Sequence, residues 1–254
     1  MTYLLAQKEL TPPTAEQLKR AFKLVKGLTD ADATKLANDA YGILIKNLLQ
    51  DDAFLLQRTL AAEGVATEVV ESGRFPKLVD PKFVRRAELT PEALVLQDPL
   101  GRPLPLPWAH MVLIAAVRVQ HFGMNKTTTE ERVMRYDPIR GLHSQTVLET
   151  RHKVASDAQW LVDIFLAGGA LRFQIEAANF IFKHTFDRPE LDLAGKVGLL
   201  VQLLSQHAPH AALNRGAFTA RVSPASDFAY AGKNYLFEES AWLLWRLARA
   251  GAGG

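Results

Sequence analysis

The chain has 254 residues, of which 48% are hydrophobic, and a formal net charge of +3. A chain of this length can bury a full core in one or two domains. It contains no cysteine, which excludes disulfides, thiolate catalysis, iron–sulfur clusters and cysteine zinc sites. The positive excess falls short of the dense basic stripe typical of a nucleic-acid binder, and we interpret it as a source of solubility.

The sequence contains neither the pattern of a signal peptide nor an apolar run long enough for a membrane helix. The first ten residues lack the basic flank and long apolar region of a signal peptide. The longest apolar runs, residues 111–117 and 199–204, are shorter than the roughly 18 residues that a membrane helix needs. We therefore expect a soluble, cytoplasmic protein that is not transmembrane.

Residues 1–73 have the clearest secondary-structure pattern. Residues 3–8 alternate like an edge strand, and Thr14 and Gln17 have the spacing of a capping box that begins a helix. The buried stripe of this helix follows the spacing i, i+3, i+4, i+7 in Leu18, Ala21, Phe22 and Val25.

Two more helices and two more strands complete this region. A second helix ends at Gly42, residues 43–45 form a strand, a third helix ends at Gly64, and residues 65–70 alternate as a closing strand. The pattern predicts a β-α-α-β-α-β domain over residues 1–73.

The same region resembles a known fold. With this order of elements, the string Leu-Val-Lys-Gly-Leu at residues 24–28 and the string Leu-Ala-Ala-Glu-Gly-Val-Ala-Thr-Glu-Val at residues 60–69 resemble the C-terminal domain of the bacterial ribosomal stalk protein, whose fold the ClpS adaptor shares. The resemblance implies binding of translation GTPases through lysines on the first two helices. Here the first helix carries Lys19, Lys23 and Lys26, whereas the second carries only Lys35, so the resemblance predicts a fold rather than a partner.

The rest of the chain is predicted to be rich in β-structure. Residues 74–82 are punctuated by proline like a linker, and residues 83–119 follow the pattern of a meander of strands. Residues 160–166 and 171–177 flank Gly168-Gly169 as a hairpin would, residues 179–182 suggest a further strand, and residues 193–207 and 240–249 have helical patterns.

These elements predict an α+β protein in which an antiparallel, barrel-like β domain over residues 83–254 is closed by C-terminal helices. The run from Gly101 to Val117 weakly resembles the pleckstrin-homology-like barrel. A polar insertion at about residues 123–157 has no apolar period, and we expect it to be mobile or only locally ordered.

No set of residues points to catalysis. The seven histidines are scattered, and Pro209 separates His207 from His210, so a helix-end histidine near the negative end of the helix dipole is the simpler interpretation and a metal pair the alternative. Paired carboxylates such as Glu238-Glu239 occur where helices are expected. We predict no catalytic residue, no metal and no cofactor.

Basic residues supply the candidate binding sites. Lys19, Lys23 and Lys26 project from the first helix on the side opposite its apolar stripe, and Arg85 and Arg86 begin the second region. Each set is either solvated surface or a contact for a partner.

The last helix carries Trp242 and Trp245, which are either core residues or anchors for a partner. The sequence therefore predicts a non-catalytic interaction or scaffolding protein whose partner is another protein. Two alternatives remain: an enzyme with a histidine and carboxylate site that no motif marks, and a binder of an anionic ligand such as a lipid head group or a nucleic acid.

Overall fold

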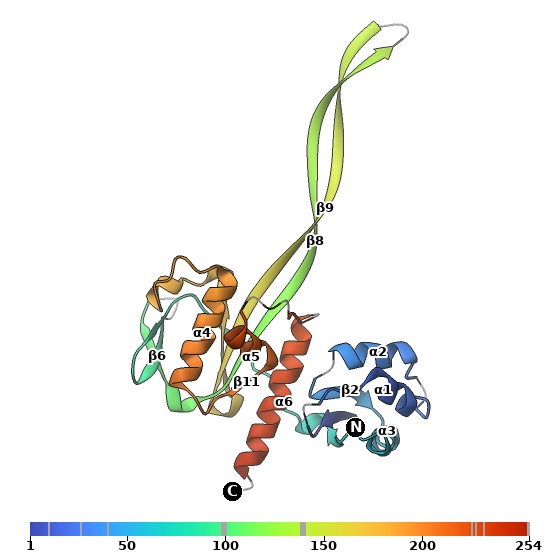
Figure 1. The fold of residues 1–254 in the computed structure, drawn as a ribbon, viewed down its shortest axis with the longest axis vertical. Coiled ribbons are helices and arrows are strands. Elements are labelled where there is room, and N and C mark those ends of the chain that lie inside the picture. The colour runs from blue at the N-terminus through green and yellow to red at the C-terminus, as the bar shows by residue number, and fades with distance from the viewer. Residues whose placement is uncertain are drawn as a thin grey trace. The chain divides into compact units, whose positions relative to one another are not determined.

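The computed structural model describes residues 1–9, 11–25, 27–39, 41–97, 101–137, 141–224, 226, 228–230 and 232–252 (Figure 1). The chain divides into two compact units, residues 1–119 with 159–254, and residues 120–158. Helices and antiparallel strands are both present, so the α+β class is confirmed. No helix of the described residues is long and apolar enough to cross a membrane.

The N-terminal elements follow the predicted order. They are β1 (Tyr3–Gln7), α1 (Ala15–Phe22), α2 (Asp30–Asp39), β2 (Ile43–Leu48), α3 (Gln50–Ala62) and β3 (Thr67–Glu71). The predicted capping box is also present at the start of α1, because the Gln17 backbone N–H donates to the Thr14 hydroxyl and the Gln17 side chain accepts from the Thr14 backbone N–H. The likeness to the stalk domain stays a prediction.

The prediction that the first strand lies at an edge is wrong. The three strands lie in the order β2-β1-β3, with both pairs antiparallel. Leu5 faces the core beneath the helices, whereas Leu4 and Ala6 face a second core on the other side of the sheet. β1 is therefore central and buried on both faces, which an alternating polar pattern does not indicate.

The second region contains eight strands in the described residues. They are β4 (Lys82–Val84), β5 (Ala87–Leu89), β6 (Ala93–Gln97), β7 (Pro103–Pro107), β8 (Met111–Asp137), β9 (Gly141–Leu166), β10 (Leu171–Glu176) and β11 (Ala212–Leu213). They form a five-stranded sheet in the order β11-β8-β9-β10-β4 and a three-stranded sheet in the order β5-β6-β7. The hairpin around Gly168-Gly169 is confirmed by the pairing of Leu171 with Leu166, and the barrel-like closure stays a prediction.

The C-terminal helices agree with the sequence pattern in part. α4 (Leu193–His207) has the predicted bounds, whereas α6 (Lys233–Ala252) is longer than the helix predicted over residues 240–249. α5 (Arg215–Val222) was not predicted. The strand expected at residues 179–182 is wrong, because this stretch forms tight turns in which the Phe180 and Thr185 N–H groups bond back to nearby carbonyls.

Regular strands also run through the polar insertion. β8 and β9 cover residues 123–137 and 141–157, so this segment contains regular strands that the sequence pattern did not indicate. Its expected mobility stays a prediction. β11 pairs with β8 only at Leu113 and Ile114, and β10 pairs with β9 only at residues 161–166. Residues 123–157 have no alternation of apolar residues, so hydrophobic periodicity could not reveal these strands.

α6 separates two sheets within the first unit. Trp242 and Trp245 pack on the side of the N-terminal sheet that carries Leu4 and Ala6. Leu236 and Leu244 of the same helix pack on alternate residues of β8 and β9. The opposite face of the five-stranded sheet packs against α4. The prediction that the two tryptophans are core residues is confirmed, since Trp242 is 3% and Trp245 9% exposed.

Candidate functional site

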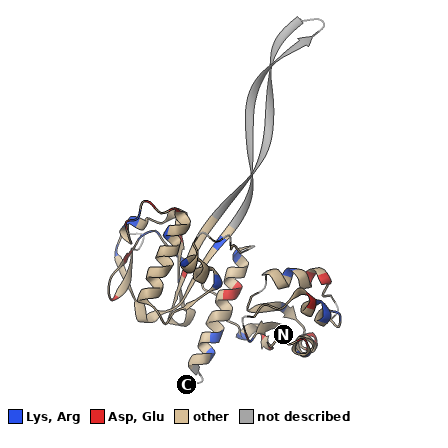
Figure 2. Ribbon diagram, viewed as in Figure 1, with Lys and Arg blue, Asp and Glu red and all other residues tan. Residues whose placement is uncertain are grey.

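The predicted basic residues lie on separate elements. Lys23 is exposed at the C-cap of α1. Lys19 on α1 forms an ion pair with Glu16 at 2.9 Å, and the hydrogen bond with Glu16 raises the pKa of Lys19. Lys26 lies outside the described residues. Arg85 and Arg86 are exposed between β4 and β5. Over the described helices, basic and acidic residues are interspersed (Figure 2).

His207 lies at the end of α4 and stacks on Trp108, with the ring centroids 4.5 Å apart. In the described part of the chain, no three histidine or carboxylate residues are grouped so that they could hold a metal ion. The structure thus gives the histidine a packing role at the helix end.

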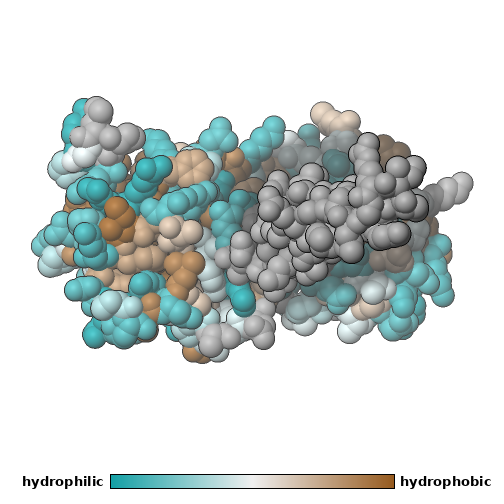
Figure 3. Space-filling model, turned by 90° about the horizontal axis from the view of Figure 1, so that it is seen from above, coloured by the Kyte–Doolittle hydropathy of each residue, from teal (hydrophilic) through white to brown (hydrophobic). Residues whose placement is uncertain are grey.

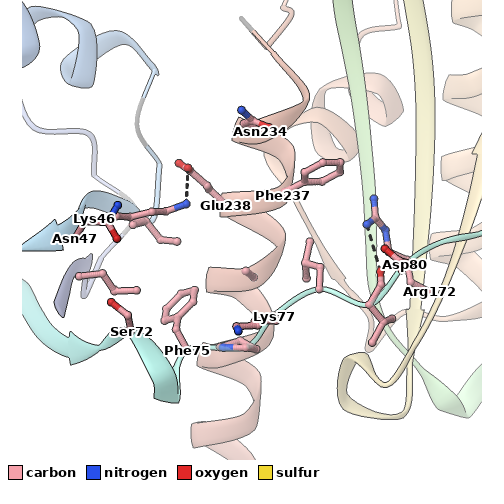
Figure 4. Close-up of a pocket in the computed structure, with 16 residues that line it drawn as sticks. Lys46, Asn47, Ser72, Phe75, Lys77, Asp80, Arg172, Asn234, Phe237 and Glu238 are labelled. Atoms are coloured by element: carbon pink, nitrogen blue, oxygen red, sulfur yellow. Dashed lines mark hydrogen bonds and ion pairs between the residues drawn. The ribbon is translucent and has the colours of Figure 1, made fainter. Parts of the chain in front are cut away.

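A groove of about 590 Å³ lies between the N-terminal sheet and α6 (Figure 4). β1 and β2 form one wall, and α6 forms the opposite wall with Asn234, Phe237 and Glu238. The segment of residues 75–80, which follows β3 and precedes β4, lines the groove between these walls. Arg172 of β10 borders one end. Three parts of the chain that are far apart in sequence therefore build one site.

The floor of the groove is apolar. Leu4, Ile43, Phe75 and Ala241 are all buried and belong to the core that joins the N-terminal sheet to α6. Phe75 is held by the ring of Trp245, at 5.6 Å between centroids. An apolar floor with polar groups placed around it is typical of a binding site.

Two ion pairs neutralise most of the charge at the groove. Lys46 of β2 and Glu238 of α6 point toward each other across it and form an ion pair at 2.6 Å. Arg172 binds the fully buried Asp163 at 2.7 Å, and its guanidinium also lies 4.7 Å from the Phe237 ring centroid. Burial raises the pKa of Asp163, against the opposite effect of the Arg172 charge and of the hydrogen bonds from Arg172 and Gln174.

Two charges at the groove are left without an ion pair. Lys77 and Asp80 are exposed on the segment between the two sheets, and neither has an oppositely charged group within 4.0 Å in the part of the chain that the structure describes. A nearby Arg172 N–H group reaches the Val79 carbonyl at 3.5 Å, which links this segment to β10. Lys77 and Asp80 are thus free to bind a ligand.

A second polar cluster holds the first unit together. The Glu239 carboxylate, which is 1% exposed, accepts hydrogen bonds from the Tyr230 hydroxyl at 2.6 Å and from the Arg215 backbone N–H at 2.7 Å. Asn214 caps α5 and bonds both backbone groups of Ala116 in β8. The Arg215 guanidinium lies 3.5 Å from the Tyr41 ring centroid. The hydrogen-bonding groups of this cluster bind one another, so we infer that the cluster stabilises the fold.

Sequence reasoning missed the groove. Its walls were read as ordinary strands and a helix, and residues 74–82 were read as a linker because prolines interrupt any period. The one sequence signal for it was the pair Trp242 and Trp245, which indicated that the last helix packs against a large apolar surface.

The remaining polar residues of the groove are hydroxyl and amide groups. The residues that line it include Ser72, whose hydroxyl accepts a hydrogen bond from Thr2, and no histidine is found among its described lining residues. Elsewhere on the face seen in Figure 3, small hydrophobic areas are surrounded by hydrophilic residues. Comparison with protein-family models, with curated proteins and with solved structures finds no match for this chain.

Proposed function

We propose that this protein is a non-catalytic interaction protein that binds an extended segment of a partner protein in the groove between its N-terminal sheet and α6. The observation that supports this most is the pairing of an apolar floor with two uncompensated rim charges, Lys77 and Asp80. The other charges at the groove already have partners in the chain.

The occupant follows from this charge pattern. Lys77 and Asp80 lie three residues apart, and three residues of an extended chain span roughly 10 Å. An extended segment with an acidic residue, an apolar anchor and a basic residue would complement Lys77, the floor and Asp80 in turn. Paired rim charges of this kind set specificity and orientation, whereas the apolar anchor provides most of the affinity.

A library of random peptides displayed on phage tests the proposal directly. The parent protein should enrich peptides in which an apolar anchor is flanked by an acidic and a basic residue. Lys77→Glu should change the selected acidic residue to a basic one and weaken the parent's best peptide by about ten-fold, measured by fluorescence polarisation. Lys183→Glu is the matched control, because Lys183 is also exposed but does not line the groove.

Lys77→Glu should fold like the parent, since Lys77 is exposed and makes no ion pair within the described residues. Enrichment of no peptide, or the same consensus from the parent and from Lys77→Glu, would contradict the proposal. An equal loss of binding in Lys183→Glu would show a general charge effect instead.

The basic residues remain candidate contacts for the same partner. Lys19, Lys23, Arg85 and Arg86 do not line the groove, so together with Lys26, which lies outside the described residues, they would act as a separate surface. A histidine and carboxylate enzyme and an anionic-ligand binder remain the alternatives. The cytoplasm is the proposed location, because a chain without cysteine suits a reducing compartment.

A further inference from the structure

We propose that the protein forms a dimer in which residues 126–137 of β8 pair antiparallel with the same residues of a second copy. This inference does not depend on the groove, because the described residues that line the groove all belong to the other unit of the chain. It starts from the length of β8 and β9 and from the charges along them.

The strands β8 and β9 are far longer than the strands beside them. In the order β11-β8-β9-β10-β4, β8 has β11 and β9 as its neighbours, and β9 has β8 and β10. β11 has two residues and β10 has six, whereas β8 has 27 and β9 has 26. Residues 120–137 of β8 therefore have a strand beside them on the β9 side alone, in the part of the chain that the structure describes.

A ribbon of two strands is marginally stable in water, because it leaves a row of backbone N–H and C=O groups unpaired along each edge. Addition of a further strand satisfies one such row. The open edge of β8 is thus a template for another strand, and the next question is which strand fits it.

The charges of β8 fit a second copy of β8. In an antiparallel arrangement centred between Glu131 and Arg132, these two residues lie opposite each other, and Lys126 lies opposite Asp137. The two-fold axis generates each of these pairs twice. Between residues 126 and 137, no charged residue is opposite one of the same sign.

The two remaining charges of this segment, Glu130 and Arg135, lie opposite the uncharged Val133 and Thr128. Their diagonal neighbours include charges of both signs, since Glu130 lies near Arg135 and Glu131, so the diagonal contacts do not decide the register. β9 is less self-complementary, because the register that places Glu149 opposite Arg151 leaves Lys153 opposite Val147. The directly opposite charge pairs therefore favour the edge of β8 and the register centred between Glu131 and Arg132.

A charge exchange within β8 tests this dimer in the full chain. The parent should sediment as a dimer in analytical ultracentrifugation. Arg132→Glu places two pairs of like charges at the centre and should weaken dimerisation by about ten-fold or more at low salt. The combined variant Glu131→Arg with Arg132→Glu has the same composition as the parent and restores opposite charges, so it should dimerise like the parent.

The absence of cysteine allows a direct test of the register. Thr129 and Met134 lie opposite each other in the proposed pairing. A mixture of Thr129→Cys and Met134→Cys chains should form an intermolecular disulfide on oxidation, because opposed Cα atoms lie within disulfide range. Each variant alone should remain uncrosslinked. A monomeric parent, a dimer that Arg132→Glu leaves unchanged, a loss that the charge exchange does not restore, or cross-linking in the single variants would overturn the proposal.

Discussion

Gly42, directly before β2, lies close to Trp242 of α6. Its φ is +83°, and a Cβ atom built on it would lie 2.5 Å from Cγ of Trp242. Its N–H group donates to the Gln7 side chain, and the Gln7 carbonyl accepts the indole N–H of Trp242 at 2.9 Å. Glycine therefore has two separate reasons to occupy this position, backbone conformation and lack of space.

Gly42→Ala should destabilise the protein by the sum of both effects. An alanine at positive φ costs about 1–2 kcal/mol, and overpacking against Trp242 costs a further ~1–3 kcal/mol. Gly64→Ala is the matched control, because Gly64 has φ +77° but open space around its missing Cβ. Urea denaturation of both variants gives the difference, and equal losses of stability would show that the contact with Trp242 is not tight.

At the scale of elements, α6 covers a sheet face that would otherwise lie open. The alternate residues of β1 point to both sides of the N-terminal sheet, so helices on one side alone leave Leu4, Ala6, Ile43 and Val70 without cover. Burial of these side chains by Trp242 and Trp245 ties the first 73 residues to the C-terminus.

A fragment of residues 1–73 should therefore bind a peptide of residues 233–252 in trans. The fragment contains no tryptophan, so a blue shift in the tryptophan fluorescence of the peptide reports burial of Trp242 and Trp245. A control peptide with Leu236→Ala and Leu244→Ala should bind equally well, because these residues face the five-stranded sheet instead. Absence of the shift, or loss of binding in the control, would contradict this arrangement of α6.

At the scale of the whole molecule, the surfaces proposed for binding are separate from one another. The groove lies between the N-terminal sheet and α6, the basic residues Lys19 and Lys23 lie on α1 and at its C-cap, and the proposed dimer uses β8. Each surface can be changed without altering the others.

Reversal of Lys19, Lys23 and Lys26 to glutamate should leave both folding and groove binding unchanged. Surface charges of this kind contribute within about 0.5 kcal/mol to stability, and screening within about 8–10 Å at physiological salt isolates them from distant sites. Thermal melts and the affinity for the selected groove peptide measure the two effects. A strong, salt-dependent loss of peptide binding would move the partner site from the groove to α1.

The sequence by itself determined the elements whose signals are local. Capping at Thr14, the stop at Gly64 and the apolar stripe of residues 18–25 define their helices because each depends on neighbours within a few residues. The same is true of the turn at Gly168-Gly169 and of α4. Of the predicted basic residues that the structure describes, Lys23, Arg85 and Arg86 are exposed and Lys19 is half-buried. Lys23 is exposed because helical periodicity directs it away from the buried stripe.

Only the tertiary structure decided which layers bury the faces of each sheet. β1 proved central because two layers, one far away in sequence, bury its opposite faces, and local alternation cannot distinguish this from an edge strand. The groove is likewise built from β2, residues 75–80 and α6. Its two unpaired charges can be identified only from the structure, which shows that Lys46 pairs with Glu238 and Arg172 with Asp163. Such pairings depend on long-range packing, for which the spacing of residues along the chain gives no signal.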